Sequence, residues 1–274
     1  MKMSKEHLDE LSAYFFLRED VLSAFFFGSE AKGDAGLDSD IDIAVYFFPH
    51  SNRLDLEDDV VFNDEEKIWT SLEKITGREV DLVVLNRASS TICASVYLEG
   101  IPIVIKDQFL YSQHFNITTD LAEEYRYFSE DYIAIKTRSQ SLNPIGRNRL
   151  LNILDFLKTE LEDTPLFDNL SKKSYLEDPT MRRTVERWIE NLVNASIDIT
   201  KIIVTSKGQP VPQTYREILL RLDTVDTIEN STAIALSGFS RLRNILAYDY
   251  LDIRYQKIKE FIKNAPLEYE KLIE

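Results

Sequence analysis

The hydrophobic positions of the chain change character near its middle. In the first half they form short continuous apolar runs, the pattern of strands buried on both faces of a sheet. Such runs predict strands over residues 21–27, 40–46, 80–85 and 101–105. Apolar residues at helical spacing predict helices over residues 4–20, 64–76 and 121–135. Strands mixed with helices indicate an α/β unit.

The second half shows helical periodicity almost throughout. Apolar stripes occupy residues 150–161, 180–206, 215–222, 239–246 and 253–263. Stripes of this kind predict an all-α helical bundle. The segment Asn143-Pro144-Ile145-Gly146, between the halves, is rich in turn-forming residues. We therefore predict two domains, residues 1–138 and 145–274.

Acidic side chains are concentrated in the first half. Of the formal net charge of −15, residues 1–140 carry −14, from 13 basic and 27 acidic side chains. Residues 141–274 carry −1, from 19 basic and 20 acidic side chains. Because it repels phosphates, the acidic half is expected to be a poor general nucleic-acid binder, while the neutral half has room for a local basic site.

Cysteine usage and hydropathy predict a cytoplasmic protein. Cys93 is the only cysteine, so a disulfide within the chain is excluded, and its apolar neighbours predict that it is buried. The N-terminus lacks the basic, apolar and small-residue order of a signal peptide. No stretch approaches the length of a membrane span, so we expect no membrane association.

Two carboxylates follow a Gly-Ser turn in the first half. Asp40 and Asp42 are two residues apart on a predicted strand, so they share one face. Such a pair is tolerated when it is solvated or when a divalent cation bridges it. Asp81, at the start of the next strand, is a candidate third carboxylate, and Gly28-Ser29 offers backbone N–H groups and a hydroxyl to a phosphate. Spacing alone favours this Mg²⁺–phosphate site no more than an ordinary solvated edge strand.

The two segments together resemble the signature of the minimal nucleotidyltransferases of the polymerase-β-like superfamily. The matching residues are Gly28-Ser29-x-Ala31-x-Gly33 and then Ser39-Asp40-Ile41-Asp42-Ile43-Ala44-Val45, and the resemblance covers roughly residues 1–135. It implies an α/β domain with a mixed sheet in which Asp40, Asp42 and Asp81 are catalytic and bind Mg²⁺. It also implies that Gly28 and Ser29, with Lys32 nearby, hold the phosphates of ATP. Glu30 stands where this family usually has a basic residue.

A second polar cluster interrupts an apolar helix near the C-terminus. Asn244 and Tyr248 are four residues apart and share a face, and Arg243 and Tyr250 align seven residues apart. Residue types alone favour a bundle cap or a dimer contact over a functional site.

This half resembles the HEPN family of HepT-like toxin ribonucleases, over roughly residues 145–265. The core of the resemblance is Leu242-Arg243-Asn244-Ile245-Leu246-Ala247. In the family motif, an Arg is followed after four to six residues by His, one further residue and Tyr. Arg243 and Tyr250 match the Arg and the Tyr, whereas Tyr248 occupies the histidine position.

The HEPN resemblance implies a homodimer through the helical domain, with RNA as a possible ligand at its cleft. A tyrosine whose pKa is near 10 is a poor proton shuttle at neutral pH, so we expect no ribonuclease activity. In the family, the partner nucleotidyltransferase transfers AMP to the tyrosine of the motif. Tyr250, or alternatively Tyr248, is the corresponding acceptor here.

Three hypotheses remain open at this stage. The leading one is a Mg²⁺- and ATP-dependent nucleotidyltransferase fused to a degenerate HEPN bundle and related to toxin–antitoxin pairs. The second is a nucleotidyltransferase for a small molecule of the antibiotic type, whose cationic substrate would suit the acidic first half. The third is a non-enzymatic dimeric interaction protein.

Overall fold

The computed structural model describes residues 5–32, 40–50, 53–138, 142–248 and 251–274. The chain divides into two compact units, Met1–Arg126 and Tyr127–Glu274, and the division falls within one long helix, α5 (Gln108–Arg138). Within the described ranges, no helix is both long enough and apolar enough to cross a membrane.

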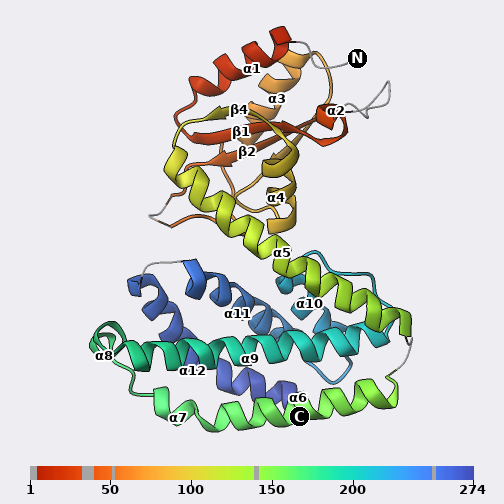
Figure 1. The fold of residues 1–274 in the computed structure, drawn as a ribbon, viewed down its shortest axis with the longest axis vertical. Coiled ribbons are helices and arrows are strands. Elements are labelled where there is room, and N and C mark those ends of the chain that lie inside the picture. Colours follow the sequence, from red (N-terminus) through yellow and green to blue (C-terminus); the bar gives the residue numbers. More distant parts are fainter. Residues whose placement is uncertain (1–4, 33–39, 51–52, 139–141, 249–250) are drawn as a thin grey trace. The chain divides into compact units, whose positions relative to one another are not determined.

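The first unit is built on a four-stranded mixed sheet (Figure 1). Its strands are β1 (Val21–Phe27), β2 (Ile41–Phe47), β3 (Val80–Val84) and β4 (Ile101–Ile105), in the order β3-β2-β1-β4. β1 is antiparallel to both β2 and β4, whereas β2 and β3 are parallel. The two central strands are β1 and β2, the strands that the longest apolar runs predict.

Helices cover both faces of this sheet (Figure 1). One core layer joins Ile43 and Val45 of β2 to apolar residues of α1 (Lys5–Phe16) and α3 (Glu65–Thr76). The other joins Ala44 and Tyr46 to α4 (Ser90–Glu99) and to the first turns of α5. Because successive strand residues face opposite ways, Asp42 belongs to the same face as Ala44 and Tyr46.

The second unit is entirely helical in its described residues. It contains the last turns of α5 and a series of helices: α6 (Pro144–Glu162), α7 (Thr164–Phe167), α8 (Lys172–Glu177), α9 (Pro179–Ser206), α10 (Tyr215–Leu220), the 3-10 turn η1 (Arg221–Thr224), α11 (Asn230–Tyr248) and α12 (Leu251–Ile273). The apolar face of α9 is buried in the middle of this bundle. A mixed α/β unit followed by a helical unit confirms the predicted fold class.

Local sequence signals explain several helix ends. Asn143 caps α6, with its side chain accepting a hydrogen bond from the backbone N–H of Gly146, and Pro144 occupies the first turn. Asp178 caps α9 in the same way, ahead of Pro179. The turn-rich segment therefore begins a helix, while the compact units divide earlier, inside α5. The domain limits 1–138 and 145–274 stay predictions.

Several helices differ from the sequence-based expectation. α1 ends at Phe16 rather than residue 20, and Arg18 beyond it bonds to Asp20 and Asp64. α5 begins at Gln108, well before the predicted residue 121. α4 was not predicted, and α12 continues past the predicted end at residue 263 with Pro266 inside it.

Candidate functional site

Two of the three predicted carboxylates lie side by side at one edge of the first unit's sheet. Asp42 on β2 pairs in register with Asp81 on β3, so both side chains leave the same face of the sheet. Asp42 is half-buried, and Asp81 is exposed. Asp40 is also exposed and precedes β2 by one residue.

Like charges surround Asp42. Burial raises the pKa of the Asp42 carboxyl, and the negative charges of Asp81, Asp40 and Glu30 raise that pKa further. Asp81 and Asp40 therefore both lie within electrostatic reach of Asp42. The fourth acid in the cluster, Glu30, comes from a different element.

Gly28 brings the backbone of the Gly-Ser turn against Asp42. It begins α2 (Gly28–Lys32) directly after β1, at a φ of 78° that side chains disfavour. A Cβ atom at this position would lie 1.9 Å from Oδ2 of Asp42, so a larger residue would force the Asp42 side chain to move. Only glycine therefore allows the Asp42 carboxylate to lie this close to the turn.

The structure gives less information on Ser29 and Lys32, the other residues predicted to bind nucleotide. Ser29 is exposed at the first turn of α2, directly after Gly28 in the chain. Lys32 is the last residue of α2, and its side chain lies outside the described part of the structure. The contact of Gly28, Ser29 and Lys32 with phosphate stays a prediction.

Glu30 points into the protein rather than toward a ligand. Its side chain is 2 % exposed, and Oε1 lies 2.5 Å from Nη1 of Arg78. Arg78 lies in the turn between α3 and β3, three residues before Asp81. The acid at the usual basic position of the motif thus forms an internal ion pair, which sequence reasoning missed.

The donor set at this edge suits a cation shared with a substrate. Among the residues that the structure describes, no group of three or more His, Cys, Asp or Glu side chains forms a protein-only metal site. Mg²⁺, however, is usually held by one or two carboxylates together with substrate phosphates. Asp42 and Asp81, in register and with like charges that raise the pKa of Asp42, fit that arrangement.

Arg243 is the residue of the second motif that the structure places fully. Its guanidinium carbon lies 5.3 Å from the centre of the Tyr215 ring, a cation–π contact between α11 and α10. Asn244 and Tyr248 belong to α11, but their side chains lie outside the described part of the structure. Tyr250 also lies outside the described residues.

A buried lysine extends this cluster. Tyr215 meets the ring of Phe128 edge-on at 5.3 Å, and Nζ of Lys201 lies 5.3 Å from the centre of that ring. Lys201 is 5 % exposed and is paired with Asp131 at 2.6 Å and Asp198 at 2.9 Å. Lys201 and Asp198 stand three residues apart in the mostly apolar second half of α9, and that polar interruption was the available sequence signal.

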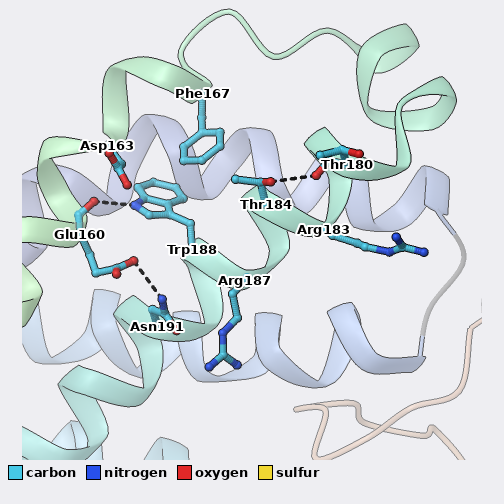
Figure 2. Close-up of a pocket in the computed structure, with 9 residues that line it drawn as sticks. All are labelled: Glu160, Asp163, Phe167, Thr180, Arg183, Thr184, Arg187, Trp188 and Asn191. Atoms are coloured by element: carbon cyan, nitrogen blue, oxygen red, sulfur yellow. Dashed lines mark hydrogen bonds between the residues drawn. The ribbon is translucent and has the colours of Figure 1, made fainter.

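A separate pocket of about 540 Å³ lies between α6, α7 and α9 (Figure 2). The indole N–H of Trp188 donates to the backbone carbonyl of Glu160 at 2.7 Å, and the Asn191 amide donates to the Glu160 carboxylate at 3.0 Å. Its lining residues are Glu160, Asp163, Phe167, Thr180, Arg183, Thr184, Arg187, Trp188 and Asn191. None of them is a predicted site residue.

Two family models match the chain, one in each unit. Residues 9–109 match the model described as polymerase beta nucleotidyltransferase, and residues 152–274 match the model described as ribonuclease HepT-like. No curated protein matches the chain.

Solved structures with some similarity include three of toxin–antitoxin proteins. One is a toxin–antitoxin with AMP-PNP, 21 % identical, with a TM-score of 0.37 over 47 % of this chain and 95 % of that chain. The second is a double aspartate-to-glutamate mutant of the toxin–antitoxin MntA-HpeT, 20 % identical, with a TM-score of 0.38 over 48 % and 97 % of the two chains. The third is a tyrosine-to-alanine mutant of MntA-HpeT, 21 % identical, with a TM-score of 0.37 over 48 % and 97 %.

Proposed function

Because the chain joins a polymerase-β-type nucleotidyltransferase domain to a HepT-like domain, we propose that it transfers AMP from ATP to a tyrosine of its own or a partner HEPN domain. The reaction depends on Mg²⁺. The observation that carries the proposal is the in-register pair Asp42 and Asp81, with the backbone of Gly28 against the Asp42 carboxylate. The two parts correspond to the proposed domains, residues 1–138 and 145–274.

The proposed step is an in-line displacement at the α-phosphorus of ATP. The acceptor hydroxyl oxygen forms a new bond to phosphorus, the bond from phosphorus to the bridging oxygen breaks, and pyrophosphate leaves. Asp81, the more exposed carboxylate, accepts the hydroxyl proton. Mg²⁺ held by Asp40, Asp42 and Asp81 would supply neutralisation of the charge on the phosphates.

The turn after β1 orients the triphosphate in this proposal. The backbone of Gly28 lies next to the Asp42 carboxylate, Ser29 adds a hydroxyl one residue later, and Lys32 adds a positive charge in the same short helix. The family resemblance of the Gly-Ser motif supports these roles. The ion pair with Arg78 offsets the negative charge of Glu30 beside this turn.

The helical half supplies the tyrosine hydroxyl that accepts AMP. It no longer cleaves RNA. Tyr250, or alternatively Tyr248, receives AMP. A phenol at the histidine position provides neither a base nor a strong acid at neutral pH. Arg243 keeps the charge needed to bind an RNA phosphate, so the HEPN cleft binds RNA without cutting it. The HEPN resemblance further supports a homodimer through this half. Light scattering at micromolar concentration tests this, and a monomer would contradict it.

A second candidate function is supported by the charge of the first half. Residues 1–140 carry a net charge of −14, which would attract a cationic small molecule such as an aminoglycoside. In that case AMP would be transferred to a hydroxyl of the small molecule and the protein would remain unlabelled.

The experiment compares two labels on ATP in the presence of Mg²⁺. With α-labelled ATP the protein becomes labelled, and with γ-labelled ATP it does not, because the γ-phosphate leaves with pyrophosphate. Asp42→Asn should abolish the α-label. Retention of the γ-label would indicate phosphate transfer instead, and labelling of an added aminoglycoside alone would favour the second candidate.

A further inference from the structure

The Glu30–Arg78 ion pair links the two halves of the proposed transfer site. We propose that it is a positioning element that holds α2, with the Gly-Ser turn, in place against the strand that carries Asp81. This inference rests on the proposed nucleotidyl transfer, because it assigns a role in that reaction to two residues that do not touch the substrate.

Burial makes Glu30 dependent on its partner. The side chain is 2 % exposed, and Oε1 lies 2.5 Å from Nη1 of Arg78. The other oxygen, Oε2, is buried with no hydrogen-bond partner among the described residues. A buried carboxylate that loses its cation is strongly destabilised, whereas an exposed pair contributes little. Glu30 therefore has a strong requirement for Arg78 at this place.

The pair spans the sheet at the end where the carboxylates lie. Glu30 belongs to α2, which continues directly from β1, and Arg78 lies just before β3. β2 separates β1 from β3 in the sheet, so the ion pair reaches across the start of β2. At the same end, the backbone N–H of Ile41 donates to the carbonyl of Glu79 at 3.0 Å. The turn before β3 is thus joined to β2 by its backbone and to α2 by Arg78.

The close contact at Gly28 makes the position of α2 critical. Gly28 begins the same five-residue helix that contains Glu30, and its backbone leaves no room for even a Cβ beside Asp42. A displacement of α2 would therefore move the Gly-Ser turn relative to Asp42 and Asp81. Misplacement of reacting groups by about 1 Å is enough to lower a rate about a hundredfold.

The variant Arg78→Met removes the cation and keeps most of the apolar stem, whereas Arg78→Lys keeps the charge. Arg87→Met is the matched control. Arg87 forms a two-pronged ion pair with Glu65, at 2.6 and 2.7 Å, beyond the opposite end of β3. Each full-length variant is assayed well below its melting temperature for kcat and for the KM of ATP, using the α-label. Hydrogen exchange of residues 28–32 without ATP provides a readout that is independent of activity.

We expect Arg78→Met to lower kcat at least about tenfold, with faster exchange in α2, and Arg78→Lys to recover most of the loss. Arg87→Met should change thermal stability little, because its ion pair is exposed, and its kcat should stay within about twofold of the wild type. A wild-type kcat in Arg78→Met, or an equal loss in Arg87→Met, would overturn the inference. If Arg78→Met does not fold, Glu30→Gln must show reduced kcat and faster exchange in α2, while Arg78→Lys must stay close to the wild type in both. A wild type that transfers no label contradicts the proposed function, and the exchange measurement then still tests whether Arg78 holds α2.

Discussion

Gly28 and Asp42 are so close that a Cβ atom on the glycine would lie 1.9 Å from Oδ2 of the aspartate. The contact joins the end of β1 to the carboxylate of β2, since Phe27 and Asp42 are also cross-strand partners. It explains why a glycine begins α2, and it makes the glycine as informative a target for mutation as the carboxylates.

Gly28→Ala should abolish nucleotidyl transfer because the new methyl group displaces the Asp42 carboxylate. Gly77→Ala is the matched control, since Gly77 has a similar φ of 65° but a Cβ atom there would have no neighbour within 4 Å. Both variants should lose about 1–2 kcal/mol from the left-handed backbone, measured by chemical denaturation. Only Gly28→Ala should lose labelling by α-labelled ATP. Equal activity in the two alanine variants would show that the contact with Asp42 has no role in the reaction.

Asp42→Asn should remove activity and, in EDTA, increase the free energy of unfolding at pH 7. The folded protein raises the pKa of Asp42 above its ordinary value of 3.8, through burial and then the charges of Asp81, Asp40 and Glu30. A raised carboxyl pKa means that the charged form destabilises the fold at neutral pH. The difference in the free energy of unfolding between Asp42→Asn and the wild type should shrink as the pH falls through the raised pKa of Asp42. It should vanish below the pKa that Asp42 has in the unfolded chain.

Denaturation of wild type and Asp42→Asn at several pH values measures this effect, with Asp120→Asn as an exposed control. If Asp42→Asn has a lower free energy of unfolding than the wild type in EDTA, a partner in the folded protein stabilises the Asp42 carboxylate. That result would contradict the prediction that its charge destabilises the fold. Such a trade of stability for activity is common at sites that bind charged ligands.

The protein should lose stability in mild acid because of His114. Burial lowers the pKa of this histidine to about 3, below its ordinary value of 6.5. Nε2 lies 3.2 Å from the backbone carbonyl of Asp55 and must donate to it, so Nδ1 accepts from the Tyr97 hydroxyl at 2.7 Å. A second proton, on Nδ1, would remove the acceptor of the Tyr97 hydroxyl and place a charge in this buried site.

Because the unfolded chain binds this proton more readily, the neutral histidine contributes stability that is lost as the pH falls below 6.5. The loss should approach about 1.4 kcal/mol per pH unit between pH 6 and pH 4. His114→Asn should show a shallower slope in denaturation experiments, whereas the exposed His50→Asn should not. Parallel slopes for wild type and His114→Asn would contradict the assignment.

The wild-type chain should not cleave RNA, and Tyr248→His should create cleavage. The histidine restores the family pattern between Arg243 and Tyr250 and supplies a group that titrates near neutral pH. The assay follows a labelled RNA with each full-length protein, and Arg243→Ala in the Tyr248→His background is the control. Robust cleavage by the wild type that Arg243→Ala abolishes would show that the nuclease has not decayed.

The sequence predicts elements best where one pattern dominates. The apolar runs of β1 and β4 have the same bounds in the structure as in the prediction. The sequence pattern did not predict α4, because its apolar residues, such as Ile92, Val96 and Leu98, are spread around the helix and form no apolar stripe. α12 runs past Pro266 because packing of its apolar face outweighs the hydrogen bond that a proline removes.

The candidate site likewise contains one contact that the sequence predicts and others that only the folded structure shows. The pairing of Asp42 with Asp81 follows from strand position, which the spacing of apolar runs reveals. The partner of Glu30 is 48 residues away, at a turn without a distinctive motif, so only the folded chain shows the ion pair. The contact of Arg243 with Tyr215 likewise depends on how two helices pack.

In the proposed function, this chain carries AMP on a tyrosine of its HEPN-like half. The most direct test of this proposal is mass spectrometry of the intact protein after incubation with ATP and Mg²⁺, followed by peptide mapping. The account predicts an added mass of AMP on Tyr250 or Tyr248, absent from Asp42→Asn and from the double variant Tyr248→Phe/Tyr250→Phe. An unmodified protein from every preparation, including one in which any prior AMP has been removed, would contradict it.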